Sequence, residues 1–322
     1  MTSRKSTSRL PAIFLAIIST AIAAQAQGRV YDFQNVKAPA AIQTDSYAVN
    51  RNGIIAGDYV DANDGQHGMI LNGSKLTTFD LPGCQTAGNT FGSIAAFGIN
   101  NLGAVAGWCV STSTGLPIAF IFANGRFTMI AFPEAAGTEA NGINDKGEVV
   151  GTYIDQAGSQ HGFYLIGKTY TTLDIPNAFE STAWGVNNAG LITVFGKNSA
   201  GTFVSFTFNG KTFKPYRVPG AGPLGTVIQT LNNNGDIVFT WYDPNNAAHG
   251  AWFHNGAYIK FNDPTKGASN TRGNGLSDAL VSGRFKGQVE IVGRYSPATL
   301  DPLSSNSNAG YAGYGCCRGD AP

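Results

Sequence analysis

Short apolar runs alternate with polar turns along most of the chain, and the whole pattern repeats. The third repeat shows it most clearly, because four runs of strand length follow one another at residues 140–144, 148–153, 161–166 and 169–175. Pro176 ends the fourth run, since proline cannot donate a hydrogen bond to a strand ladder. The pattern predicts a unit of four antiparallel β-strands.

A short phrase, Asn-x-x-Gly, stands between the first two runs of each repeat. An asparagine side chain can accept hydrogen bonds from the backbone that follows it, and glycine takes up a positive φ without strain. A degraded sixth copy of the phrase follows at Ser277. We therefore predict structural turns at five pairs, which are Asn50 with Gly53, Asn100 with Gly103, Asn144 with Gly147, Asn187 with Gly190, and Asn232 with Gly235.

The spacing of these turns predicts the fold. Units of about 45 residues with four antiparallel strands are the blades of β-propellers. The last repeat offers runs at 279–285 and 289–294 for its second and third strands but lacks a fourth, and residues 30–36 resemble the missing one. We predict an all-β, six-bladed β-propeller of four-stranded antiparallel blades, closed by the N-terminal strand because closure removes two open sheet edges. The alternative is an open solenoid of the same units.

A second regularity lies in the second run of most repeats, where a glycine precedes a bulky residue by two positions. A bare glycine beside a bulky residue suggests sheets that pack closely face to face. The pairs are Gly57 with Tyr59, Gly107 with Cys109, Gly151 with Tyr153 and, in the last repeat, Gly283 with Phe285.

The chain divides into three segments. Residues 1–26 have the positive start, apolar middle and small-x-small end of a signal peptide. Residues 27–295 hold the repeats and form the propeller domain, and residues 296–322 form a flexible tail rich in Gly, Ser, Asn and Tyr. We therefore expect an exported protein, extracellular or periplasmic, that is a monomer with no transmembrane span once the signal peptide is removed.

Charge and cysteine content narrow the chemistry. The net charge is +1 and no basic stripe is present, which argues against a nucleic-acid partner because phosphate neutralisation needs clustered Lys and Arg. No Cys or His spacing matches a zinc site, and we expect no metal and no cofactor. Four cysteines in an exported chain permit disulfides. We predict one between Cys84, in the loop leading into the second blade, and Cys109, near the end of that blade's second strand, because both reach the same face.

The third run of several repeats begins with a related tripeptide. It reads His-Gly-Met at residues 67–69, Ile-Ala-Phe at 118–120 and His-Gly-Phe at 161–163. Together with the Gly-Ile-Asn-x-x-Gly phrase and the Val-Val-Gly-x-Tyr strand, these motifs resemble the secreted bacterial HAF-repeat proteins over about residues 30–295. The resemblance implies an extracellular, propeller-like repeat and implies no catalytic residue.

Histidines recur at the start of the third run, and aspartates recur in the loop before them. Repetition favours a structural role, because an active site is normally built once whereas a brace is built in every unit. We predict that each imidazole braces its own hairpin and that each aspartate forms an Asx turn. The residues are His67, His161 and His249, with Asp61, Asp155 and Asp243.

The innermost strand of each blade offers a candidate ligand site. Three residues before each turn asparagine or its equivalent, the side chain differs from one repeat to the next, as it would if each blade met a different part of one asymmetric ligand. We predict that these residues line the mouth of the channel on the face of the long interblade loops, with Trp184 stacking on the ligand. The set is Tyr47, Phe97, Asn141, Trp184, Gln229 and Asn274.

These observations favour a secreted, non-catalytic binding or scaffold module whose partner is an extracellular glycan or protein. The first alternative is a secreted carbohydrate-active enzyme, a glycoside hydrolase or lyase on a propeller scaffold, for which Glu134, Glu139 and Glu180 are the candidate carboxylates. The second alternative is a cell-surface structural protein. No serine-nucleophile signature accompanies these carboxylates, so we predict no catalytic residues and no enzyme.

Overall fold

The computed structural model describes residues 36–85, 94–262, 268–277 and 291–297. The described residues form β-strands joined by turns and loops, with no helix among them, and so with none that could span a membrane. Several predicted segments lie outside the described residues. They are the signal peptide, residues 30–35 of the closing strand, the strand at 279–285 and residues 298–322 of the tail.

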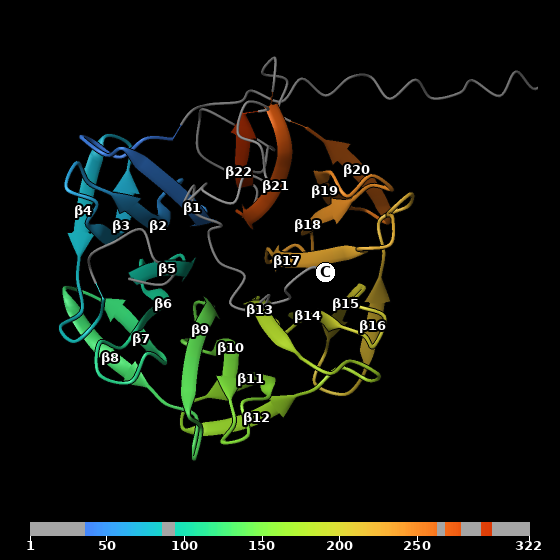
Figure 1. Ribbon diagram of the computed structural model, residues 1–322, viewed down its shortest axis with the longest axis horizontal. Helices are drawn as coiled ribbons and strands as arrows, with labels where there is room; N and C mark the ends of the chain where they lie inside the picture. Colours follow the sequence, from blue (N-terminus) through green and yellow to red (C-terminus); the bar gives the residue numbers. More distant parts are fainter. Residues whose placement is uncertain (1–35, 86–93, 263–267, 278–290, 298–322) are drawn as a thin grey trace, which may run out of the picture. The chain divides into compact units, whose positions relative to one another are not determined.

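Twenty strands form five four-stranded antiparallel sheets, one from each of the first five repeats (Figure 1). The first sheet consists of β1 (Gln43–Val49), β2 (Ile55–Val60), β3 (Gln66–Asn72) and β4 (Lys75–Phe79). The second consists of β5 (Ile94–Ile99), β6 (Val105–Val110), β7 (Pro117–Ala123) and β8 (Arg126–Ile130). The third consists of β9 (Gly137–Ile143), β10 (Val149–Ile154), β11 (Gln160–Ile166) and β12 (Thr169–Leu173).

The fourth sheet consists of β13 (Thr182–Val186), β14 (Ile192–Lys197), β15 (Phe203–Phe208) and β16 (Phe213–Tyr216). The fifth consists of β17 (Thr226–Leu231), β18 (Ile237–Tyr242), β19 (Ala248–His254) and β20 (Ala257–Phe261). In all five sheets the strands pair in sequence order, so the first strand of each repeat is one edge and the fourth strand is the other.

First strands of successive repeats pack against each other around a common centre (Figure 1). Contacts run from β1 to β5, β9, β13 and β17 in turn, then to β21 (Ala268–Leu276), and β21 contacts β1 again. Because the series returns to its start, the sheets form a closed ring with the first strands innermost. This is the architecture of a β-propeller with four-stranded antiparallel blades, and it excludes the open solenoid.

The last repeat differs from its prediction. β21 pairs directly with β22 (Ile291–Pro297), so the run expected as the third strand takes the place of the second. The register pairs Gly273 with Gly293, as it pairs Ser46 with Gly57 in the first sheet. Gly293 and Tyr295 therefore hold the positions that the repeat spacing assigned to Gly283 and Phe285. Sequence spacing misses this because residues 278–290 intervene between the two strands, and β22 also extends two residues into the predicted tail.

Close packing within one sheet, and not between neighbouring sheets, explains the recurrent glycine of the second strand. Gly151 pairs with Phe163 of β11, and a side chain at Gly151 would collide with that ring and with the backbone oxygen of Glu139 on β9. Gly57 with Met69 and Gly107 with Phe120 repeat this arrangement. The third residue of the His-Gly-Phe-like tripeptide is thus a core anchor. Met69, Phe120 and Phe163 are all fully buried.

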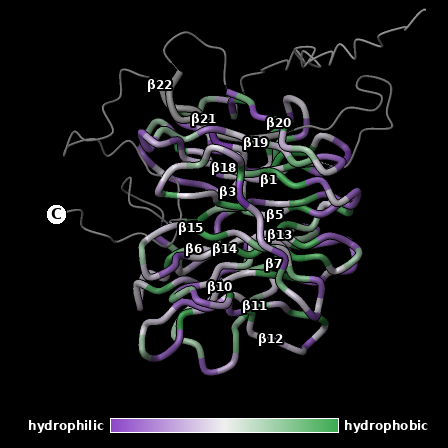
Figure 2. The backbone as a smooth tube through the Cα atoms, turned by 90° about the vertical axis from the view of Figure 1, so that its right-hand side faces the viewer, coloured by the Kyte–Doolittle hydropathy of each residue, from purple (hydrophilic) through white to green (hydrophobic). Residues whose placement is uncertain are grey.

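Hydrophobic stretches follow the strands, and hydrophilic stretches occur at many of the turns (Figure 2). The largest core cluster joins residues of several blades rather than one sheet, for example Phe97, Phe163, Trp184 and Phe239. In a propeller both faces of a blade pack against neighbours, so burial continues around the ring and is not confined to one side of each sheet.

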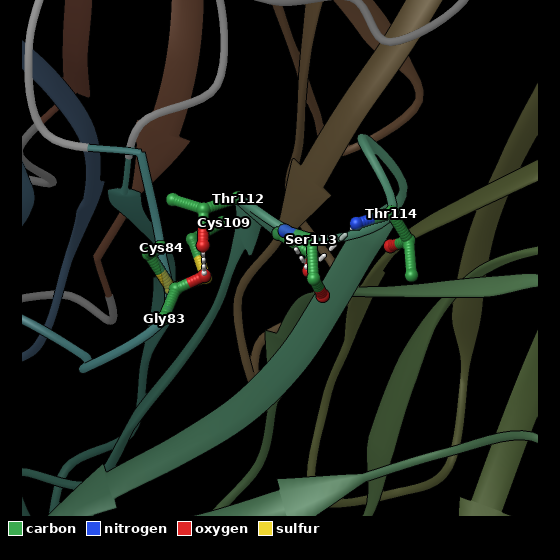
Figure 3. Close-up of a disulfide and its surroundings, with 7 residues drawn as sticks. Gly83, Cys84, Cys109, Thr112, Ser113 and Thr114 are labelled. Carbon is green, nitrogen blue, oxygen red and sulfur yellow. Dashed lines mark hydrogen bonds between the residues drawn. A yellow bond between two sulfur atoms is a disulfide. The ribbon is translucent and has the colours of Figure 1, made fainter.

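The predicted disulfide between Cys84 and Cys109 is confirmed (Figure 3). The two Cα atoms lie 5.8 Å apart, and Cys84 also forms a β-bridge with Ser111, just beyond β6. Thr112 adds two hydrogen bonds to the backbone oxygen of Gly83, from its N–H at 2.9 Å and its hydroxyl at 3.1 Å. The bond therefore fastens the interblade connection to the end of the second strand in its own repeat.

Candidate functional site

The turn asparagines form a hydrogen-bonded belt around the ring. In the second repeat, Oδ1 of Asn100 accepts the backbone N–H groups of Leu102 at 3.0 Å and Ala104 at 2.9 Å, while Gly103 has φ +83°. Nδ2 of Asn100 donates across to the backbone oxygen of Asn144 in the next repeat, at 3.0 Å. The same bond joins Asn50 to Asn100, Asn144 to Asn187, Asn187 to Asn232 and Asn232 to Ser277. Each asparagine therefore shapes its own turn and also ties its blade to the next one.

A second belt is formed by the residue after each asparagine. The N–H of Arg51 donates to the side-chain oxygen of Asn101 at 2.9 Å, and the N–H of Asn101 donates to Asp145 at 2.7 Å. The series continues from Asp145 to Asn188 at 2.9 Å and from Asn188 to Asn233 at 2.8 Å. Sequence reasoning missed this belt, although a signal exists because the position is Asn or Asp in four of the five complete repeats.

A central cavity of about 70 Å³ lies inside these belts. Its walls are the second halves of the innermost strands, and the belt residues Arg51, Asn101, Asp145, Asn188 and Asn233 also line it. The first strand of each blade runs from the interblade connection towards the Asn-x-x-Gly turn, so the cavity lies at the turn end of the ring. We expected the site on the opposite face, among the interblade loops. The cavity that the described residues form lies instead at the end of the ring that carries the Asn-x-x-Gly turns.

The six residues predicted to line the mouth lie on the innermost strands as expected, but their side chains are buried. Exposed fractions range from 1% for Asn141 and Gln229 to 9% for Asn274. The aromatic members pack on one another, with ring centroids 4.6 Å apart for Tyr47 and Phe97, and 5.8 Å apart for Phe97 and Trp184. Four of the six, Tyr47, Phe97, Asn141 and Trp184, line the deep part of the cavity, whereas Gln229 and Asn274 do not line it.

Asn141 is the polar member of this deep layer. Its Nδ2 donates to the backbone oxygen of Ala183 in the next blade at 3.1 Å, and it lies 3.4 Å from the hydroxyl of Thr152. Its Oδ1 is buried and accepts no hydrogen bond from the described residues. Asn141 therefore links β9 to the next blade from within the packed wall of the cavity.

Asp145 is the one carboxylate among the described lining residues. Its Oδ2 accepts from the side-chain amides of Asn101 at 2.9 Å and Asn188 at 2.8 Å, and its Oδ1 accepts the Asn101 N–H. Partial burial raises the pKa of Asp145, but the hydrogen bonds from Asn188 and Asn101 and the charge of Arg51 outweigh it, so the pKa lies below its usual value. Asp145 is therefore ionised at neutral pH.

The candidate hydrolytic carboxylates do not come together at the cavity. Glu139 lies on β9, is 7% exposed, and burial raises its pKa to about 8. Glu180 lies 4.0 Å from Nζ of Lys197, and Glu134 is an exposed turn residue with φ +60°. None of the three lines the cavity, and within the described residues no group of three or more Cys, His, Asp or Glu could hold a metal ion.

The repeated histidines are structural clasps, as predicted. Nδ1 of His161 lies 2.9 Å from Asp174 at the end of the fourth strand, and its Nε2 lies 3.5 Å from Asp155 in the preceding loop. Asp155 also accepts the backbone N–H groups of Ala157 and Ser159, which makes it the expected Asx turn. His67 with Asp61 and Asp80, and His249 with Asp243 and Asn262, form the same clasp. An Asp or Asn thirteen residues after each histidine is the second partner, and this spacing is visible in the sequence.

Comparison with known proteins identifies the fold and no family. No protein-family model matches the chain, and no curated protein matches it. Among solved structures, AofleA from Arthrobotrys oligospora is similar at 10% identity over 80% of this chain and 82% of that chain, with a TM-score of 0.50. The Aleuria aurantia lectin, described as a six-bladed β-propeller that recognises fucose, is 14% identical over 68% of this chain and 76% of that chain, with a TM-score of 0.43.

At these identities the likeness to AofleA supports the fold alone. The protein is thus a β-propeller with a polar-rimmed central cavity, and the resemblance to the HAF-repeat proteins stays a prediction.

Proposed function

We propose that this protein is a non-catalytic saccharide-binding module whose site is the central cavity. One observation carries the proposal, namely that aromatic rings and a ring of side-chain amides line the same small space. Tyr47, Phe97 and Trp184 lie at the bottom, and Asn101, Asp145 and Asn188 lie at the rim. Sugars combine apolar faces with many hydroxyl groups, and sites of this composition suit them.

The size of the cavity also favours a small polar ligand. About 70 Å³ holds roughly five water molecules, so the cavity takes part of one sugar residue and is too small for a peptide segment. The rim is rigid because the two belts hold it, so a ligand would meet preorganised donors and acceptors.

The carboxylates at the cavity favour saccharide binding over saccharide hydrolysis. Glycosidases generally place two carboxyl groups on either side of the scissile bond. The described part of the cavity wall offers Asp145, whose oxygens already accept three amide hydrogen bonds. Such a group is poorly suited to act as a nucleophile or to exchange protons.

Two further parts of the proposal concern residues outside the described ranges. We propose that the ring has six blades, with residues 30–36 supplying a strand to the blade that β21 and β22 begin. We also propose that residues 1–26 direct export, which agrees with the disulfide between Cys84 and Cys109 because such bonds persist in oxidising compartments.

The test is a glycan array probed with the exported full chain, followed by calorimetric titration of the sugars that bind. Fucosides belong on the array because fucose is the ligand named for the Aleuria aurantia lectin. An Asn233→Tyr variant would place a bulky side chain at the exposed rim and should abolish binding.

The matched control is Asn234→Tyr, because Asn234 is also exposed but does not line the cavity. Binding that survives Asn233→Tyr unchanged would move the site elsewhere on the ring. An array without any bound saccharide would refute the proposed function.

A further inference from the structure

Arg51 departs from the belt in which it lies. The other four described residues of this belt are Asn or Asp. The side-chain oxygen of each accepts the backbone N–H of the belt residue in the preceding repeat. A guanidinium group has five N–H donors and no acceptor, so it cannot perform this task. The side chain of Arg51 therefore stands at the cavity rim without the structural role that Asn or Asp has at every other described position.

The side chain of Arg51 also has no partner among the described residues. Arg51 is exposed, it belongs to the cavity lining, and no described residue pairs with it in an ion pair or a side-chain hydrogen bond. Asp145 is the nearby anion, since the charge of Arg51 contributes to its lowered pKa. Asp145 does not neutralise Arg51 in a bidentate pair, because both of its oxygens are engaged by amides of the neighbouring blades.

The deep end of the cavity carries no charged group among the described lining residues. Its wall includes the rings of Tyr47, Phe97 and Trp184. A ligand that fits both ends therefore has an apolar face against the rings and an anionic group at the rim beside Arg51.

We propose that the ligand is an acidic saccharide, with its carboxylate bound by Arg51 at the rim of the cavity. The inference rests on the proposed function and specifies its ligand class. Planar guanidinium groups bind carboxylates with two parallel hydrogen bonds, which favours a uronic acid over a neutral sugar. The rim amides of Asn101 and Asn188 remain beside the sugar hydroxyl groups, and the cavity takes part of one sugar residue.

The experiment is a calorimetric titration of the full chain with glucuronate, glucose and glucose 6-sulfate at two salt concentrations. We expect glucuronate to bind about tenfold more tightly than glucose, with an affinity that falls as salt screens the charge. Arg51→Gln should remove this preference, so that glucuronate and glucose bind the variant with equal affinity. Folding is not at risk, because the side chain of Arg51 is exposed and the belt bond uses its backbone N–H.

Lys146→Gln is the matched control. Lys146 is an exposed cation in the equivalent turn of the third repeat, it does not line the cavity, and its loss changes the net charge equally. The control should keep the preference for glucuronate. Equal binding of glucose and glucuronate, a preference for the sulfate, or an equal effect of both variants would overturn this inference and leave the proposed function intact. Failure of every saccharide to bind would overturn both.

Discussion

Nδ2 of Asn50 donates to the backbone oxygen of Asn100 at 3.1 Å, and this bond joins two blades that are 50 residues apart in sequence. Both residues are buried, with exposed fractions of 3% and 5%. If Nδ2 of Asn50 is removed, no water takes its place, and the backbone oxygen of Asn100 is left buried without a donor. The repeat phrase is thus the link between blades as well as a turn.

The belt should therefore respond strongly to truncation of one asparagine. Asn100→Ala removes two acceptor bonds within the turn and one donor bond to the next blade, and we expect it to lower the free energy of unfolding by about 3 kcal/mol. Asn234→Ala, at an exposed turn position, should change it by no more than about 0.5 kcal/mol. Denaturant unfolding measures both, and equal values would show that the interblade bond contributes little.

The disulfide should stabilise the ring by restricting the unfolded chain. Cys84 and Cys109 are 25 residues apart, and the chain-entropy model gives about 3 kcal/mol for a loop of this length. The Cys84→Ser, Cys109→Ser double variant should melt at a lower temperature than the parent in calorimetry. Peptide mapping of the exported parent that finds both thiols free would contradict the bond itself.

Deletion of residues 30–36 tests the closing strand. We expect the deletion to destabilise the whole ring, because the last blade would keep an unpaired strand edge beside β22. A matched deletion of seven residues from the tail beyond residue 305 should have little effect on the unfolding transition. A variant lacking residues 30–36 that melts like the parent would rule out closure by this segment.

Glu139 should make stability depend on pH. Burial raises its pKa to about 8, above its usual value of 4.5, so the folded state holds a proton that the unfolded state releases. Stability from this group is complete below about pH 4.5 and declines as pH rises towards 8. Glu139→Gln should match the parent near pH 4 and exceed it at pH 8, as measured by urea unfolding at both values. A variant with the same decline as the parent would place the titrating group elsewhere.

Local signals were enough to predict much of this protein. The Asn-x-x-Gly turns depend on hydrogen bonds within four or five residues and on the positive φ of glycine, so the sequence shows them directly. Four strand-length runs per repeat predicted the blade, and the positions of Cys84 and Cys109 within one repeat predicted their bond. The histidine clasps followed from repetition, although their partners thirteen residues later did not.

What the sequence left open depends on neighbours from other repeats. The belt bonds of Asn100 and Asn144 join residues 44 positions apart, and the cavity lies at the turn end because the second halves of all the innermost strands meet there. The low exposure of Trp184, 7%, also depends on other repeats, since both faces of a propeller blade are covered by adjacent blades. Gly293 could not be aligned from spacing, because strand register is decided by pairing with β21 and not by the length of the intervening chain.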